Sequence, residues 1–79
     1  MDPVAAARRL VAAIGTPAAA QWVHHEAADF LEQAPRGAAV LEVVMKRNVV
    51  FVSWAAGAAS GTWMLAFDRE GRLMAWRGM

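Results

Sequence analysis

The sequence contains no cysteine among its 79 residues. Neither a disulfide nor a cysteine-ligated metal site can therefore stabilise the chain, although a chain of this length buries only about 60% of the surface that its unfolded form exposes. Long apolar runs are lacking as well, because charged residues interrupt every window that could span a membrane. The interrupting residues are Arg8, Arg9, Glu26, Asp29 and Glu32.

Charge of one sign is also scarce, since eight basic and seven acidic residues leave a formal net charge of +1. So small a charge creates no strong field that would attract nucleic acid, and the placement of the basic residues at turns and strand ends explains them sufficiently. The first residues, Met1-Asp2-Pro3, lack the basic and apolar segments of a signal peptide. We therefore expect a cytoplasmic protein that binds neither nucleic acid nor membrane.

Enzyme motifs are absent: the sequence has no Gly-rich phosphate loop, no Gly-x-Ser-x-Gly and no Ser/His/Asp set at credible spacing. His25 and Asp29, four apart on one helical face, approach the His-Glu-x-x-His run of zinc proteases, but two ligands alone hold zinc poorly. Glu42, beside Ser53, would act as a general base only if a partner enclosed it. We expect no catalytic residue, no metal and no cofactor.

Helix punctuation is plentiful in the first half of the chain. Asp2 can cap a helix, Pro3 suits its first turn, and Gly15 can end it in the left-handed conformation. Thr16-Pro17 repeats the start signal, and apolar spacing predicts a second helix that runs to about Ala34. The two expected apolar stripes are Val4, Ala7, Leu10, Val11 and Ile14, then Val23, Ala27, Phe30, Leu31 and Ala34.

From Ala38 the apolar period changes to two residues, which is typical of strands. Residues 40–45 and 49–54 predict a hairpin around Arg47-Asn48. The register that follows sets Met45 opposite Val50, Val43 opposite Val52 and Leu41 opposite Trp54 on the face that receives the helices.

A second predicted hairpin joins residues 62–67 to 72–76, with Gly71 in the left-handed position of its turn. The segment 55–61, rich in small residues, is expected to form a loop or a bent strand crossing. The fold class is therefore α+β: two N-terminal helices packed on a four-stranded antiparallel sheet, in one domain that spans residues 1–79.

Apolar residues exceed what such a core can hide. They make up 58% of the chain, against roughly 45–50% in soluble domains. A half-solvated sheet should alternate apolar and polar residues, yet the predicted hairpins are apolar on both faces, with Trp54 and Trp63 on the covered one. Exposed apolar patches usually mark binding surfaces, and oligomerisation compensates for a small core, so we expect a homodimer. The candidate interface or ligand-binding residues are Phe51, Met64, Met74, Trp76, Trp22 and Glu42.

Residues 38–76 also follow a recognisable order of elements. The strand 49–54 ends in Trp54, a bend of small residues follows, and the run 67–73 turns at Glu70-Gly71. This pattern resembles the C-terminal strands of NTF2-like (SnoaL-like) proteins. Members of that family are longer and enclose a ligand pocket within a cone-shaped sheet, so the resemblance implies an abridged version. Its pocket would be small, open or completed by a second subunit, and no family acid–base residue has a matching position.

Two functions from different classes follow. The first is a non-catalytic interaction module that self-associates through an apolar sheet face and binds or inhibits another protein complex. A bacterial or phage protein that blocks a host complex would have such a design. The alternative is an NTF2-like protein that binds a small apolar molecule, or a lyase/isomerase-like enzyme, with a pocket on the sheet. That pocket would lie against Phe51, Met64, Met74 and Trp76, with Glu42 as its polar group.

Overall fold

In the computed structural model, which describes residues 2–79, the first helix begins where the sequence predicts. Helix α1 spans Pro3–Ala12, and Asp2 caps it by accepting a hydrogen bond from the Val4 N–H at 2.9 Å. Gly15 follows with φ +70°, the left-handed conformation that glycine adopts without a steric cost. Cap and stop signals are local, so the sequence predicted this element correctly.

The second predicted helix is wrong as one continuous element. A 3-10 helix, η1 (Pro17–Gln21), comes first, the backbone is extended at His24, and helix α2 spans His25–Gln33. The alanine-rich η1 buries none of its residues. Helical stability in proteins comes mostly from packing, so the helical propensity of these alanines alone does not produce one straight helix. Val23, expected in the buried stripe, lies in the break and is 79% exposed.

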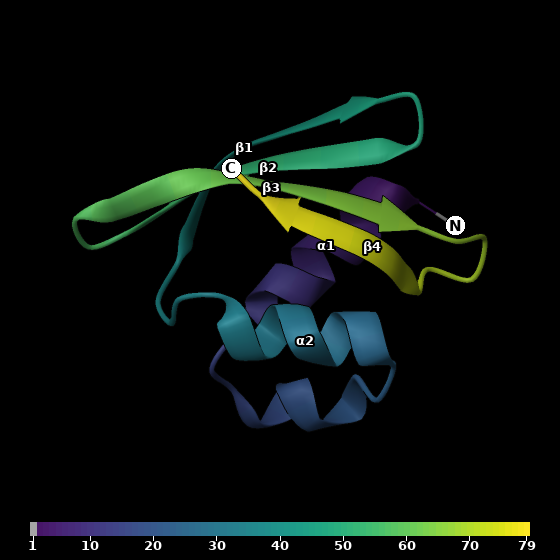
Figure 1. Ribbon diagram of the computed structural model, residues 1–79, viewed down its shortest axis with the longest axis horizontal. Helices are drawn as coiled ribbons and strands as arrows, with labels where there is room; N and C mark the ends of the chain where they lie inside the picture. Colours follow the sequence, from purple (N-terminus) through teal and green to yellow (C-terminus); the bar gives the residue numbers. More distant parts are fainter. Residues whose placement is uncertain (1) are drawn as a thin grey trace.

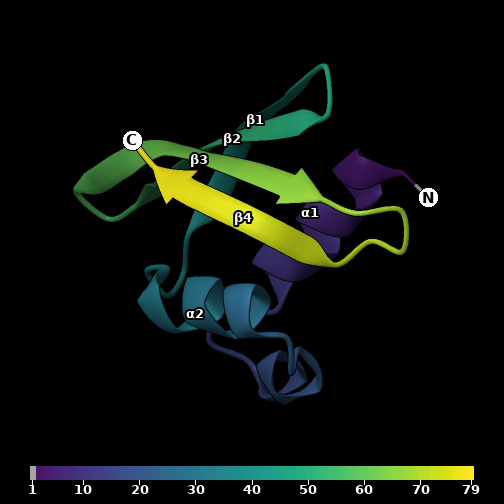
Figure 2. The same ribbon diagram turned by 45° about the vertical axis from the view of Figure 1, so that its right-hand side comes forward.

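The sheet contains four antiparallel strands in sequence order: β1 (Ala39–Lys46), β2 (Val49–Ala56), β3 (Ala59–Phe67) and β4 (Leu73–Gly78). Both helices lie on one side of it (Figures 1 and 2), which confirms the predicted α+β arrangement. The turns at 47–48 and 68–71 are also confirmed, with Gly71 at φ +83°. The expected bend at 55–61 is instead a tight hairpin turn around Gly57, where Ala56 pairs with Ala59.

A β-bulge at Leu41 changes which side chains at the start of β1 point toward the helices. Val43 pairs with Val52 and Met45 with Val50, as predicted, but it is Val40 that lies opposite Trp54. The predicted pair of Leu41 and Trp54 is therefore wrong. An extra residue in one strand reverses which side chains beyond it face the core, and Leu41 is 66% exposed.

A second irregularity in register occurs between β3 and β4. Phe67 pairs with Leu73 but Ala66 pairs with Ala75, so Met74 has no residue opposite it. Leu65, which faces the helices, consequently lies opposite Trp76. The prediction that Trp76 lies on the uncovered face is therefore wrong. It assumed that β3 and β4 pair without a bulge, and the bulge turns Trp76 to the face that the helices cover.

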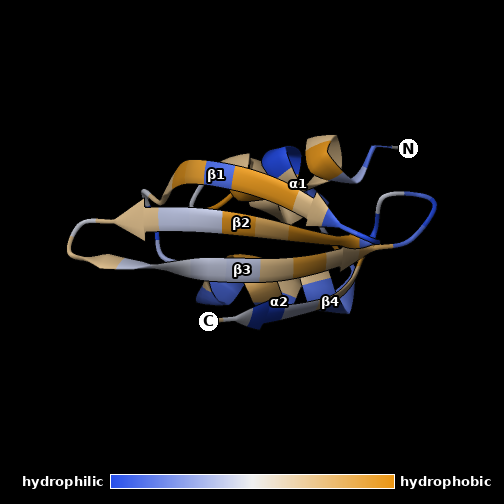
Figure 3. Ribbon diagram, turned by 90° about the horizontal axis from the view of Figure 1, so that it is seen from above, coloured by the Kyte–Doolittle hydropathy of each residue, from blue (hydrophilic) through white to orange (hydrophobic). Residues whose placement is uncertain are grey.

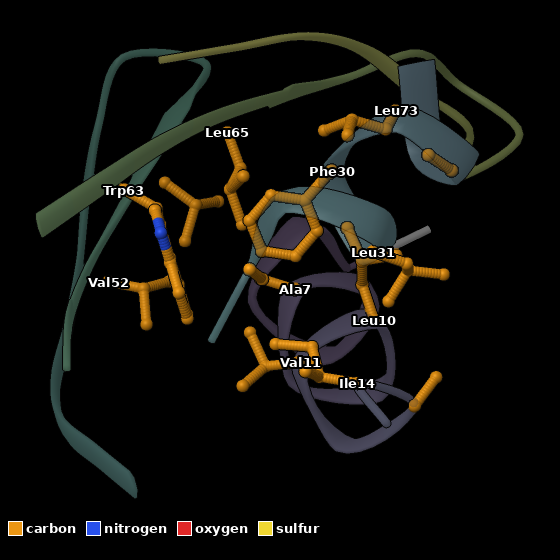
Figure 4. Packing of buried hydrophobic residues seen from close by; sticks show 14 residues of the cluster. Ala7, Leu10, Val11, Ile14, Phe30, Leu31, Val52, Trp63, Leu65 and Leu73 are labelled. Carbon is orange, nitrogen blue, oxygen red and sulfur yellow. The ribbon is translucent and has the colours of Figure 1, made fainter. Parts of the chain in front are cut away.

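The core lies between the two layers (Figure 4). Phe30 of α2 is fully buried, and its ring meets Trp63 edge to face at a centroid distance of 5.0 Å. Trp76 approaches the same ring in the same manner at 5.3 Å. The largest fully buried side chains are Phe30, Leu10, Leu65, Val50 and Val52.

Candidate interface on the open face

The side of the sheet that faces away from the helices is called here the open face. Figure 3 looks onto it and shows hydrophobic colour along β1 and in the middle of β2 and β3. Strand register aligns Val44, Phe51 and Met64 in one row across these strands. The open face comprises Glu42, Val44, Lys46, Val49, Phe51, Ser53, Thr62, Met64, Ala66, Ala75 and Arg77.

Three predicted site residues lie on the open face. Phe51 and Met64 are direct neighbours and half-buried, and Glu42 is exposed opposite Ser53. Met74, at the bulge of β4, is 61% exposed but belongs to no row of paired residues. The structure therefore brings together Phe51, Met64 and Glu42, and leaves Met74 at the margin.

Trp76 and Trp22 lie outside the rows of this surface, although Trp76 borders a hollow of it beside Met64. The Trp76 Nε1–H donates a hydrogen bond to Asp29 Oδ2 of α2 at 3.1 Å, and Asp29 Oδ1 accepts a second one from Gln33 at 2.7 Å. Trp76 thus ties β4 to the helix layer, and this link was missed by reasoning from sequence. Trp22 lies in the break before α2 and packs partly against the core.

Sequence reasoning also missed how exposed β1 is. None of its residues is buried, and Val44 and Met45 are 39% and 47% exposed. β1 is an edge strand, and α1 rather than α2 lies beneath that side of the sheet (Figure 3). The signal available in the sequence was the pair of charged residues, Glu42 and Lys46, within an otherwise apolar strand, since charges are characteristic of sheet edges.

The polar side chains of residues 2–79 are all at least partly exposed. Within residues 2–79 no polar or charged residue is buried, and no three His, Asp or Glu side chains gather where a metal could bind. The open face offers apolar contact area, with Glu42 and Lys46 exposed along β1.

A hollow of about 540 Å³ lies apart from the open face and is lined by Arg9, Trp22, His24 and Arg72 among others. Arg72 is already engaged, because its Nε donates to Asp68 Oδ2 at 2.9 Å and its Nη2 lies 3.5 Å from Glu70 Oε2. Two carboxylates thus balance the Arg72 guanidinium.

Asp68 organises the turn that precedes β4. Its Oδ1 accepts hydrogen bonds from the backbone N–H groups of Glu70 and Arg72, each at 2.9 Å. The N–H of Arg72, with further contributions from the Arg72 side chain and the Glu70 N–H, lowers the pKa of this carboxyl below its usual value. The turn is held by its own polar contacts, and its role is structural.

No family model, curated protein or solved structure matches the chain. The resemblance of residues 38–76 to NTF2-like proteins stays a prediction. Among the helices of residues 2–79, none is both long and apolar enough to cross a membrane.

Proposed function

We propose that this chain is a non-catalytic protein-interaction module that self-associates as a homodimer through the uncovered side of its sheet. The observation that carries the proposal is the row of Val44, Phe51 and Met64 on the open face. A solvated sheet face would carry polar residues at these central positions. Contact with a second copy would remove this apolar surface from water, which is favourable by about 25 cal/mol per Å².

A cytoplasmic location accords with the absence of cysteine. The same surface would also serve for binding another protein complex. In either case the affinity would come from apolar side chains near the centre of the contact, with polar residues such as Glu42 and Ser53 around them.

The test compares two substitutions of exposed or half-buried apolar residues by aspartate. Phe51→Asp places a carboxylate in the middle of the proposed contact, and we expect the dimer dissociation constant in sedimentation equilibrium to rise at least about 100-fold. Val23→Asp changes an even more exposed residue in the break before α2 and should leave the dimer unchanged. Circular dichroism must show that both variants fold. A wild-type chain that is monomeric at roughly 100 µM would contradict self-association, and a dimeric Phe51→Asp variant would contradict burial of the open face in the dimer.

A small apolar ligand is the second candidate, because a shallow hollow of about 220 Å³ lies on the sheet beside Met64 and Trp76. Pockets for drug-sized ligands usually measure about 300–1,000 Å³, so the hollow suits only a small molecule. Saturable quenching of tryptophan fluorescence by such a ligand, at constant molecular mass, would favour this function over self-association.

A further inference from the structure

Strand β1 leaves one of its two edges without a partner strand. The sheet order places it at the end, next to β2 alone. Unpaired N–H and C=O groups along a sheet edge are a template for pairing with another strand. β1 is also the strand of this sheet that buries no residue at all, and Glu42, Val44, Met45 and Lys46 along it are exposed.

Hairpin geometry determines which residues present these groups. Lys46 and Val49 close the two-residue turn at 47–48, and the closing pair of such a turn is hydrogen-bonded. By alternation, Val44 and Lys46 direct their N–H and C=O groups toward β2. Val43 and Met45 direct theirs outward. An incoming strand would therefore pair with Val43 and Met45.

The charges along β1 are complementary to those of a second copy of the same strand. The segment reads Glu42-Val43-Val44-Met45-Lys46, with an acid and a base at equal distances from Val44. If two copies run antiparallel about Val44, each Glu42 lies directly opposite Lys46 of the other copy. Cross-strand pairs of opposite charge stabilise a sheet, whereas like charges opposite each other destabilise it.

Val43 and Met45 direct their backbone N–H and C=O groups outward, so in an antiparallel pair of β1 strands each must lie opposite a residue that does the same. This condition limits the possible registers. Moving the register by two residues places Val44 opposite either Glu42 or Lys46, and both ion pairs are lost. Moving it further toward the start of the strand places Glu42 opposite Glu42. Only the register centred on Val44 satisfies both the backbone and the charges.

We propose that β1 pairs antiparallel with β1 of a second copy, centred on Val44, so that two four-stranded sheets become one continuous sheet. This inference rests on the proposed self-association but places the contact at the strand edge, so that the open faces of the two copies lie side by side and Phe51 lies one strand away from the contact. Val43 of one copy exchanges hydrogen bonds with Met45 of the other, and the two Val44 side chains meet on the open face. Their rows with Phe51 and Met64 join into one apolar strip across the two-fold axis.

The other edge of the sheet lacks this complementarity. β4 carries Arg77 and no acidic residue, so self-pairing of β4 offers no ion pair between the two copies. Its bulge at Met74 also interrupts regular pairing.

Charge reversal tests the register. Glu42→Lys and Lys46→Glu each replace two attractive cross-strand pairs by two repulsive ones, and we expect each to raise the dimer dissociation constant about tenfold or more. The double variant Glu42→Lys/Lys46→Glu restores attraction and should bind within about threefold of wild type. Glu32→Lys, an exposed charge change on α2, is the matched control and should have no effect. Single variants that dimerise like wild type, or a double variant as weak as the singles, would overturn the proposed register.

Amide hydrogen exchange separates edge pairing from stacking of open faces. On dimerisation the Val43 and Met45 amides should slow markedly, while the Val44 amide, already directed toward β2, should change little. A dimer in which Val43 and Met45 exchange as fast as in the monomer would overturn edge pairing but leave the proposed function standing. A chain that never dimerises would overturn both.

Discussion

The two edges of the sheet differ in how they are held. β4 lies over α2, with Leu73 buried in the core and Trp76 bonded to Asp29 of that helix (Figure 2). β1 has no buried residue, and its Leu41, Val44 and Met45 side chains reach solvent. Each edge contains one bulge. The bulge of β4 brings an aromatic residue into the core, whereas the bulge of β1 turns an apolar residue out of it.

This difference separates stability from interaction in a small molecule. The β4 side, where Phe30 contacts both Trp63 and Trp76, supplies core packing. The β1 side keeps apolar residues and a strand edge available for another chain. Substitutions on the two sides should therefore have separable effects, on unfolding free energy in one case and on self-association in the other.

Phe30→Ala should have the largest effect on stability. Phe30 is fully buried between the helices and two tryptophans, and truncation of a buried phenylalanine typically costs 3–5 kcal/mol. Urea denaturation should show the chain largely unfolded without denaturant. Val23→Ala, at an exposed position, should shift the unfolding free energy by less than about 0.5 kcal/mol. A fully stable Phe30→Ala variant would refute the importance assigned to the β4 side.

Trp76→Phe should have a smaller effect. It keeps an aromatic ring beside Phe30 but removes the hydrogen bond to the Asp29 carboxylate. Because this bond to a charged group is only partly buried, we expect a loss of about 1–2 kcal/mol. A double-mutant cycle with Asp29→Ala isolates the interaction, and additive effects of the two substitutions would show that the bond does not contribute. Dimerisation of Trp76→Phe should remain close to wild type.

The smallest effect should come from acidification of the turn before β4. Because hydrogen bonds lower the folded-state pKa of Asp68, its ionised form contributes stability above the usual carboxyl pKa. That contribution is lost as the pH falls through the folded-state value, so the relevant range lies below about pH 4. The melting temperature of wild type should fall more steeply there than that of Asp68→Asn. Parallel curves would show that Asp68 does not stabilise the turn.

Much of the fold was predictable because the signals were local. The first helical segment begins after Asp2 and ends before Gly15. Turns occur at Arg47-Asn48 and at Gly71, where the residue types favour them. The second helix was mispredicted because alanine spacing looks helical whether or not packing supports it. Val23 matched the apolar period, yet it lies in the break between η1 and α2 and is exposed.

The candidate site was predictable in part. Phe51, Met64 and Glu42 were correctly placed on the open face because β1 pairs regularly with β2 from Glu42 to Lys46, and β2 pairs with β3 without a bulge. Trp76 and Leu41 were predicted on the wrong faces, because each of their strands contains a bulge that shifts the register by one residue. A hydrophobicity pattern with a period of two cannot reveal a bulge within an apolar strand, since the residues on either face look alike.

The sequence alone determined the order of the elements, the antiparallel hairpins and an excess of apolar residues, because caps, turns and composition depend on neighbours along the chain. Only the tertiary structure decided which apolar residues are exposed. Each bulge reverses the faces of the residues beyond it, and the break before α2 places that helix beneath β4 rather than β1. Edge β1 is left open for that reason.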